Sequence, residues 1–398
     1  MKRRAFTTGL FLIAICVALV AAMTAQGQRN ESQTPPVADY AVSGPYTHKN
    51  LTIFLLHGAG QSQGRAPLTL QEAMKRKLVV VRETGDVNRL TIQNRSNQDV
   101  FVQAGDIVKG GQQDRALALD LIVPPKSGKI PIDAFCVEQG RWSRRGNEGV
   151  SAFSASDNAL ASKDLKIAAK ARMSQGDVWA NVSKTQEKLA MNMTVTPSAT
   201  PAPRRASRRA GSGAGTGIGA GRDVSVAGGS FQVGGGPTTG SDSIGGLTSV
   251  TDRASPSSLQ MTLENKLVKD TANDYIKNLS SIINGKRDVI GFVFAINGQI
   301  NSADVYSSNA LFAKLWPKML EASAIESIAE LKADEKFEPV DANAVKAFLR
   351  ESQAGKAETK RVTARTSVVK CETEKNLFFE SRDHAQKGKW VHRNYITK

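Results

Sequence analysis

Cysteine and histidine are scarce in this chain, which has three cysteines and four histidines in 398 residues. The histidines, His48, His57, His384 and His392, are scattered, and no two histidines or cysteines have the spacing of zinc ligands. The same scatter leaves no cysteine–histidine signature of nucleophilic catalysis. We therefore expect no metal site, and the sequence indicates no cofactor.

Acidic residues are too few to balance the basic ones. The chain has 37 Asp and Glu against 53 Lys and Arg, which gives a formal net charge of +16. This excess favours an anionic partner, either a small molecule or a polymer. Basic tails exposed to solvent explain the charge equally well, because much of it lies in the N-terminal segment and in residues 196–258. The arginine pairs at 204–205 and 208–209 have no aromatic residues between them, so sequence-specific binding of nucleic acid is not expected.

The N-terminus has the pattern of a secretory signal peptide. Basic residues at 2–4 precede an apolar run from Leu10 to Met23, and small residues follow at Ala25 and Gly27. The run is about 14 residues long, whereas a helix that spans a bilayer needs about 20. We expect cleavage after Gly27 and export to the periplasm or beyond. The alternative is an uncleaved membrane anchor, and only in that case would the protein contact a membrane.

Export would leave two cysteines in the mature chain, Cys136 and Cys371. Two cysteines in an oxidising compartment can form one disulfide. The alternatives are two buried thiols, or Cys136 as a nucleophile, which would need a base nearby.

Composition divides the chain after the signal peptide (1–27) into four segments. Residues 28–45 are polar and are expected to be a flexible lead-in, and residues 46–195 are the first part of an α+β domain. Residues 196–258 are dominated by Gly, Ser, Thr, Pro and Ala. They have too few apolar side chains to offset the entropy of ordering, so we expect a long disordered basic insert. Residues 259–396 are the second part of the same domain.

Short β-branched and apolar runs in the first part predict antiparallel strands. Val79–Val81 is one strand, residues 90–102 are expected to form a hairpin, and 118–123 is expected to pair with 130–137. Such a unit hides its edges by forming a sandwich or a barrel-like sheet. Helices are expected to pack on it.

The second part is predicted to alternate helices and strands. A helix begins near Leu259, and the fully apolar run Val289–Ile296 is typical of a central strand. Asn297-Gly298 predicts a tight hairpin turn. Residues 311–328 are expected to be helical despite Pro317.

Two polar clusters follow strand-like runs in the first part, at 110–115 (GGQQDR) and 136–142 (CVEQGRW). A strand of about six residues spans roughly 20 Å, so two successive strands would return the chain to the same end of the sheet. Backbone N–H groups and two converging guanidiniums could then hold an anion. The candidate ligand-binding residues are Gly110, Gly111, Gln112, Gln113, Arg115, Gln139, Arg141 and Trp142.

Two other interpretations of the clusters remain open. In a hydrolase, Glu138 would be the acid/base, and Arg115 and Arg141 would bind phosphates. In a purely structural reading, the glycine pair only makes a tight turn, Glu138 forms an ion pair with an arginine, and Trp142 packs against the domain.

These motifs resemble one bacterial domain family, named for its association with ADP-ribosylglycohydrolases and rhodanese-phosphatases. The resemblance rests on GGQQDR, CVEQGRW, QGDVW at 175–179 and GFVFAINGQINSADVYSSNALFAKLWPKML, and it covers roughly 46–396. It implies a link to ADP-ribose or nucleotide metabolism. We therefore expect an exported binding or scaffold domain that recognises an anionic or nucleotide-like ligand. The alternative is a hydrolase of a nucleotide- or ADP-ribose-derived substrate.

Overall fold

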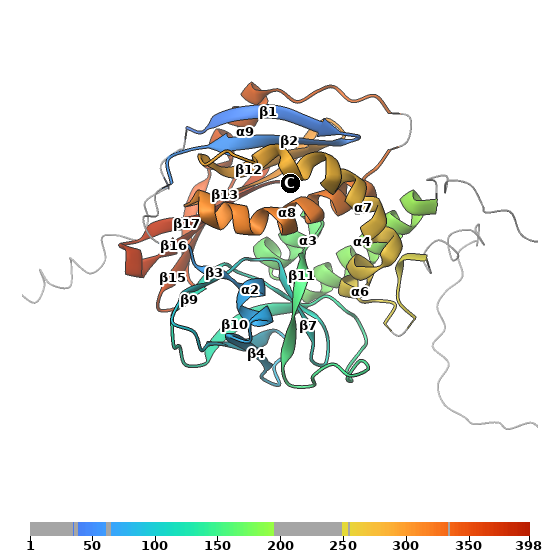
Figure 1. The fold of residues 1–398 in the computed structure, drawn as a ribbon, viewed down its shortest axis with the longest axis vertical. Coiled ribbons are helices and arrows are strands. Elements are labelled where there is room, and N and C mark those ends of the chain that lie inside the picture. The colour runs from blue at the N-terminus through green and yellow to red at the C-terminus, as the bar shows by residue number, and fades with distance from the viewer. Residues whose placement is uncertain (1–34, 36–38, 61–64, 195–248, 254, 333–334) are drawn as a thin grey trace, which may run out of the picture.

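An eight-stranded antiparallel sheet, here called sheet A, is built from both ends of the chain (Figure 1). The computed structural model describes residues 35, 39–60, 65–194, 249–253, 255–332 and 335–398. Strand β2 pairs with β12, so residues separated by more than 200 positions share one sheet. Across the sheet the strands are β1 (Ala41–His48), β2 (Leu51–His57), β12 (Val289–Ile296), β13 (Gln299–Tyr306), β17 (Lys389–Thr397), β16 (Asn376–Asp383), β15 (Thr366–Glu372) and β14 (Lys356–Arg361).

Strand β12 confirms the prediction of a central strand, because all eight of its residues are buried. Phe292 and Phe294 face the helices that cover one side of sheet A, and Val293 faces the opposite side. Asn297 and Gly298 have φ of 52° and 72°, which is the geometry of the predicted hairpin turn. Both faces of the strand therefore contribute to a hydrophobic core.

Two smaller sheets form the opposite side of the domain. They enclose an apolar cluster of their own, which includes Val81, Ile92 and Val102. One has the order β11 (Phe153–Ala159), β7 (Asp106–Gly110), β8 (Arg115–Leu117), β10 (Ile130–Cys136), β5 (Arg89–Asn94) and β4 (Val79–Glu83). The other has the order β3 (Leu68–Thr69), β6 (Val100–Val102) and β9 (Leu121–Val123).

The two predicted hairpins of the first part are wrong in their pairing. Strand β5 pairs with β4 and β10, whereas β6 pairs with β3 and β9. Asn94 turns the chain out of the first sheet, because its side-chain amide donates to the carbonyls of Gln98 and Val123. Asp120 lies between β8 and β9, and its carboxylate accepts the Ala104 N–H group. This bond to another segment interrupts the strand between β8 and β9.

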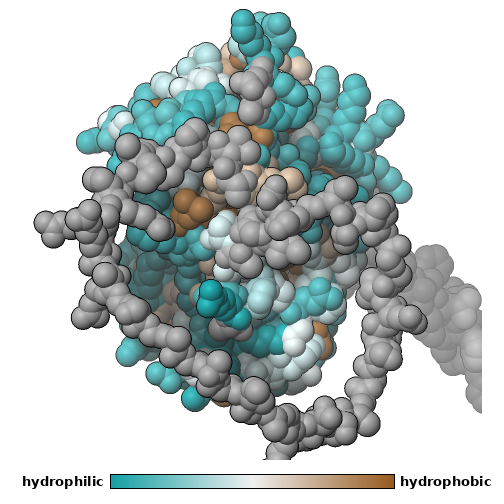
Figure 2. Space-filling model, turned by 90° about the vertical axis from the view of Figure 1, so that its right-hand side faces the viewer, coloured by the Kyte–Doolittle hydropathy of each residue, from teal (hydrophilic) through white to brown (hydrophobic). Residues whose placement is uncertain are grey.

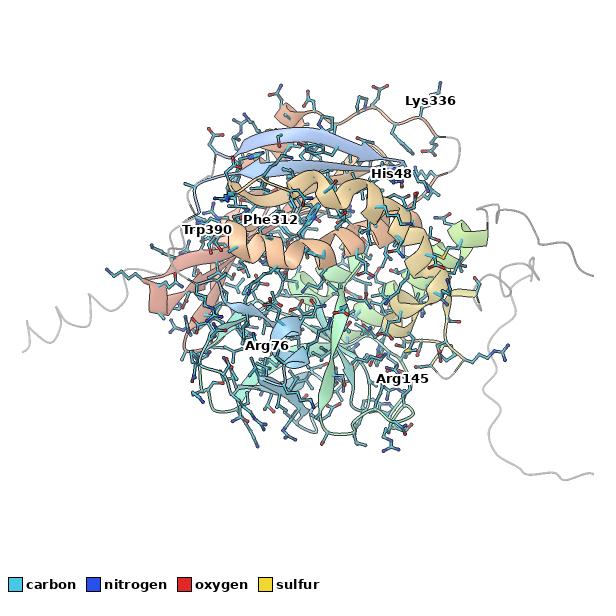
Figure 3. The ribbon with its side chains drawn as sticks, viewed as in Figure 1. His48, Arg76, Arg145, Phe312, Lys336 and Trp390 are labelled. Atoms are coloured by element: carbon cyan, nitrogen blue, oxygen red, sulfur yellow. The ribbon has the colours of Figure 1, made fainter. Side chains whose placement is uncertain are left out.

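Helices fill the space between sheet A and the smaller sheets, with α8 across the middle (Figure 1). Phe312 on α8 lies in this layer, and α9 covers the other face of sheet A (Figure 3). Helix α8 runs through Pro317 as predicted. The helices are α2 (Leu70–Lys75), α3 (Lys163–Lys166), the π-helix η1 (Ile167–Arg172), α4 (Gln175–Thr194), α6 (Leu259–Glu264), α7 (Lys266–Leu279), α8 (Asn309–Ala329), α9 (Ala342–Ser352) and the 3₁₀ helices η2 (Ser280–Ile283) and η3 (His384–Gln386).

The predicted α+β class, with helices packed on mainly antiparallel sheets, is confirmed; among the described strand pairs, β3 and β6 are parallel. Where grey atoms do not cover it, the outer face that carries α4 and α7 is mainly hydrophilic, with a few apolar patches (Figure 2). Among the described helices, none is both long enough and apolar enough to span a membrane. The predicted signal peptide, 1–27, lies outside the described residues.

Two predicted boundaries need correction. The lead-in of 28–45 overlaps β1, because residues 41–43 already pair with β2. Most of the predicted insert, residues 196–248, lies outside the described residues. Its last positions are described, however, and Val250, Ser255 and Ser258 are buried. Ser258 accepts the Met261 N–H group as the N-cap of α6, so positions within 249–258 pack with the second part of the domain.

We predict that a short Gly/Ser linker in place of residues 196–248 changes the free energy of unfolding little, because that composition has few apolar side chains to bury. Extending the replacement to residue 258 removes the buried Val250 side chain and two hydroxyls that donate to buried carboxylates. This second variant should lose about 3 kcal/mol or more. Denaturant unfolding of the two variants measures the difference, and equal stability would show that residues 249–258 contribute nothing.

Candidate functional site

The two polar clusters predicted from the sequence meet at one end of the six-stranded sheet. Arg115 and Cys136 are paired across β8 and β10. The Val137 N–H group donates to the Asp114 carbonyl at 3.0 Å, and Arg141 Nη1 donates to the Gly111 carbonyl at 3.2 Å. The expectation that both clusters lie at the same end is therefore confirmed.

A buried network of charges holds the clusters together. Arg141 donates from Nε and Nη2 to the two oxygens of Glu138, both at 2.6 Å. Arg145, which is labelled in Figure 3, donates from both Nη atoms to Asp114 at 3.0 Å and reaches Glu148 at 2.9 Å. Both Asp114 and Glu138 are fully buried. Each carboxylate is therefore matched by a guanidinium.

Residues from the second part of the chain complete this network. The Ser255 hydroxyl donates to Glu138, and the Ser258 hydroxyl donates to Asp114 at 2.9 Å. Burial alone raises the pKa of Glu138, but hydrogen bonds from Arg141, Ser255 and the Asp114 amide outweigh it and hold the pKa below its ordinary value. Glu138 is thus an ionised carboxylate with both oxygens in use, which disfavours it as a general acid.

The glycine pair serves the protein's own acceptors. The Gly110 N–H group donates to Asp114 at 2.8 Å, and the Gly111 N–H group donates to the Gly149 carbonyl at 3.0 Å. Gly111 has a φ of 60°, and a Cβ there would lie 2.5 Å from a Glu83 oxygen. The backbone donors expected to hold an anion are therefore already occupied.

Of the remaining predicted residues, Arg115 and Gln113 have buried donors without a partner in the described part of the chain. Arg115 is buried, donates to the carbonyl and side-chain oxygens of Gln113, and lies 3.6 Å from Glu83. In the described part of the chain, Arg115 Nε and Gln113 Nε2 have no hydrogen-bond partner. Gln112 and Gln139 are exposed, and Trp142 is 53 % exposed rather than packed.

Both described cysteines are free, buried thiols, so the disulfide between Cys136 and Cys371 is not formed. Burial raises the pKa of Cys136 to about 11, which leaves a neutral thiol and disfavours it as a nucleophile. The side chain of Gln175, from the QGDVW motif, makes two hydrogen bonds to the backbone of Cys136. It accepts from the Cys136 N–H group and donates to the Cys136 carbonyl, both at 2.8 Å. Gln175 in that motif therefore has a structural role.

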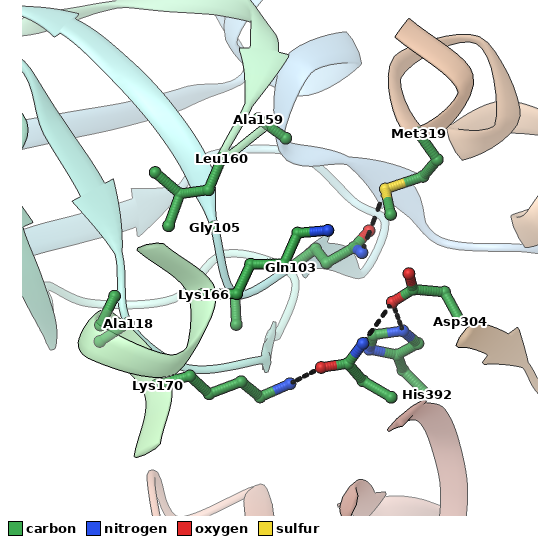
Figure 4. Close-up of a pocket in the computed structure, with 13 residues that line it drawn as sticks. Gln103, Gly105, Ala118, Ala159, Leu160, Lys166, Lys170, Asp304, Met319 and His392 are labelled. Carbon is green, nitrogen blue, oxygen red and sulfur yellow. Dashed lines mark hydrogen bonds and ion pairs between the residues drawn. The ribbon is translucent and has the colours of Figure 1, made fainter. Parts of the chain in front are cut away.

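A second polar site, which sequence reasoning missed, lies between sheet A and the smaller sheets (Figure 4). It surrounds a cavity of about 20 Å³, enough for one or two water molecules. Its polar wall consists of Gln103 from the β6–β7 turn, Lys166 and Lys170 from α3 and η1, Asp304 from β13, and His392 and Asn394 from β17. These residues come from distant segments, and only the two lysines share a local pattern. No short motif could therefore reveal them.

His392 is held between two carboxylates in this site. Its Nδ1 lies 2.8 Å from Asp120 and its Nε2 lies 3.0 Å from Asp304, while Tyr306 stacks on the ring with centroids 4.6 Å apart. Burial lowers the pKa of His392, but Asp120 and Asp304 outweigh it and raise the pKa above its ordinary value. Burial raises the pKa of Asp120, whereas Lys170 and His392 bring it far below the usual range. His392 therefore bridges the carboxylates of Asp120 and Asp304.

Lys166 and Lys170 approach the cavity from one helix face. Lys170 is only 7 % exposed; its Nζ donates to Asn394 at 3.2 Å and lies 4.5 Å from the Phe379 ring centroid. Burial lowers its pKa. Among the described residues, neither lysine has a carboxylate oxygen within 4 Å. Lys170 belongs to a six-residue π-helix, a rare element that is frequent at functional sites.

A family model described as "ARG and Rhodanese-Phosphatase-superfamily-associated Protein domain" matches residues 39–396. No curated protein and no solved structure matches the chain. Within the described residues, no group of three or more His, Cys, Asp or Glu side chains is arranged to hold a metal ion.

We predict that Arg141→Ala lowers the free energy of unfolding by about 3–5 kcal/mol, because it leaves the buried Glu138 carboxylate without its main partner. Arg144→Ala is the matched control: Arg144 is exposed and should change stability by less than about 0.5 kcal/mol. Urea unfolding of both variants is the measurement. Equal effects would show that the network contributes no stability at Arg141.

We predict a loss of stability on the alkaline side from His392. Its folded pKa is raised, so its contribution is complete below the unfolded value of about 6.5 and disappears as pH rises through the folded pKa. His392→Gln cannot titrate and should lack this decline. Unfolding free energies of both proteins between pH 6 and pH 9, a window around that value, test the prediction. A difference between them that is constant or grows with pH would contradict it.

Proposed function

We propose that this protein, which belongs to the family of ARG and Rhodanese-Phosphatase-superfamily-associated Protein domains, binds a small anionic ligand beside Lys166 and Lys170. One observation carries the proposal: Lys166 and Lys170 line one cavity, and within the described residues neither ammonium group has a carboxylate oxygen within 4 Å. The carboxylates of this site, Asp120 and Asp304, both bond His392. The two lysine side chains are therefore left without a direct carboxylate partner in the described residues.

An anion would accept hydrogen bonds from N–H groups of Lys166 and Lys170 that have no other acceptor in the described residues. Lys170 directs one N–H bond to Asn394, and the partly buried Lys166 ammonium lies 5.5 Å from the Phe294 ring centroid. An ammonium has three donors, so several remain for the oxygens of a phosphate or carboxylate. Burying a charge without a partner is costly, and that cost falls when a ligand supplies the counter-charge.

The size of the cavity limits which part of a ligand can enter. A space of about 20 Å³ is too small for a nucleotide. Lys166 has a long, partly exposed stem, and its displacement would enlarge the entrance. We infer that the cavity holds only the anionic head of a larger molecule. The family's link to ADP-ribose makes a phosphate group the first head to test.

The two sequence clusters have a different role in this proposal. Arg141 is committed to Glu138, Arg115 contacts Gln113 and Glu83, and the glycine N–H groups donate to internal acceptors. These contacts support the structural interpretation, in which the clusters fix the loops around residues 110–115 and 136–148. A secretory signal in residues 1–27 would place this binding domain outside the cytoplasm, and we retain export as part of the proposal.

We predict that inorganic phosphate or ADP-ribose binds the wild-type protein and that Lys170→Met weakens the binding at least about tenfold, or 1.4 kcal/mol. Methionine keeps an apolar stem against Phe379 and removes the charge. The control is Lys184→Met, because Lys184 is exposed and paired with Asp164 at 2.9 Å. The affinity of the Lys184→Met variant for phosphate or ADP-ribose should equal that of the wild type.

Isothermal titration calorimetry at fixed ionic strength makes this comparison, and melting temperatures confirm that each variant is folded. The proposal fails if neither probe binds the wild type, or if Lys170→Met binds as tightly as Lys184→Met. Arg141→Ala, where it remains folded, should retain binding. Loss of binding in that variant alone would place the site at the sequence clusters instead.

A further inference from the structure

A groove of about 460 Å³ opens beside the C-terminal end of α8 and the β12–β13 turn. Its volume is within the range of small-molecule sites. Lys163 at the start of α3, Asn301 on β13, Glu326 on α8 and Thr397 on β17 contribute to its wall. These residues are separate from those that line the cavity at Lys170.

Four residues of this wall form a closed ring of hydrogen bonds through side-chain and backbone groups. Glu326 Oε1 accepts the Lys163 backbone N–H at 2.7 Å and the Asn301 side-chain amide at 2.8 Å. The Thr397 hydroxyl bonds the Asn301 carbonyl at 3.0 Å, and Lys163 Nζ donates to that hydroxyl at 3.1 Å. The ring fixes the positions of the Glu326 carboxylate and the Lys163 ammonium, which lie on either side of Asn301.

This ring leaves both acceptors and donors unused. Glu326 is 3 % exposed, yet its Oε2 has no partner among the described residues, and neither has Asn301 Oδ1. The Lys163 ammonium has no carboxylate oxygen within 4 Å in the same part of the chain. A buried carboxylate oxygen without a donor is costly and rare in folded proteins.

The other charges that line the groove are already matched. Lys188 pairs with Glu330, Lys332 with Glu335 at 3.1 Å, Lys398 with Glu372 at 2.7 Å, and Asp164 with Lys184 at 2.9 Å. Lys163 and Glu326 are therefore the charges of this wall that remain for a ligand.

We propose that this groove binds a small zwitterion with one ammonium and one carboxylate, such as a free α-amino acid. The ligand's ammonium would donate to Glu326 Oε2 and Asn301 Oδ1. Its carboxylate would accept from Lys163 Nζ. A simple anion or a simple cation would satisfy only one side of the wall, so both charges are needed for tight binding.

The test begins with a thermal-shift screen of the common free amino acids at millimolar concentration. At least one should raise the melting temperature. Calorimetry with that amino acid, its amide and its N-acetyl derivative then removes the ligand's carboxylate and ammonium in turn. Each derivative should bind at least about tenfold more weakly.

Two variants test the wall itself. In Glu326→Gln, the side-chain oxygen can keep the two internal hydrogen bonds, while an NH₂ group replaces the free oxygen and repels the ammonium. Lys163→Met removes the other charge and keeps the backbone N–H. Both should lose at least about tenfold in affinity, whereas Lys332→Met, on the same groove but paired with Glu335, should not.

The proposal is overturned if no amino acid raises the melting temperature, or if Glu326→Gln and Lys163→Met both bind the amino acid like wild type. Phosphate binding serves as a separate readout. If phosphate binds and amino acids do not, the cavity proposal stands and the groove proposal fails. If amino acids bind and phosphate does not, the opposite holds.

Discussion

Charge pairing around Glu138 and Asp114 is the interaction on which the part of the domain built from the smaller sheets depends. The two carboxylates receive guanidiniums from the loop after β10 and hydroxyls from residues 255 and 258. The loops that carry GGQQDR and CVEQGRW, and the start of the second part, are thus fixed to one another. A buried ion pair adds little stability relative to an apolar contact, but losing one partner is expensive. The network therefore specifies one arrangement of these loops.

The same reasoning separates structural charges from candidate functional ones. A protein that matches Arg141, Arg145 and Lys318 with buried carboxylates can evidently satisfy an interior cation. Lys170 is as deeply buried as Lys318, yet its Nζ bonds an amide oxygen and lies over an aromatic ring, with no carboxylate oxygen within 4 Å in the described residues. Because the paired cations and the unpaired Lys170 are buried in the same domain, we assign ligand binding to the lysines between the sheets and a structural role to the arginines of the motifs.

Local signals were sufficient for much of the fold. The apolar run of β12, the Asn297-Gly298 turn and the helix through Pro317 each depend on neighbouring residues, and the structure confirms all three. Strand pairing in the first part was predicted wrongly because side chains decide it at a distance. Asn94 and Asp120 end strands by bonding to backbone groups of other segments, and propensity does not reveal such bonds.

The candidate sites depend even more than the strand pairing on contacts between residues far apart in the sequence. The two motifs were visible because each is compact in sequence. They meet because β8 pairs directly with β10, and not through the predicted pairing of 118–123 with 130–137. His392 gave no signal, since its partners Asp120 and Asp304 lie 272 and 88 residues away. Lys170 looked like an ordinary helical lysine in a run rich in alanine and lysine. Only the fold shows that its face of the helix packs against sheet A.

The cavity and the groove are neighbours because the same elements build both. Lys163, Lys166 and Lys170 are spaced i, i+3 and i+7, which places them along one face of α3 and η1. Opposite them, β13 and β17 present Asn301 and Thr397 to the groove, then Asp304 and Asn394 to the cavity. None of the three lysines has a carboxylate partner within 4 Å in the described residues. One helix face and one strand pair therefore build the walls of both spaces.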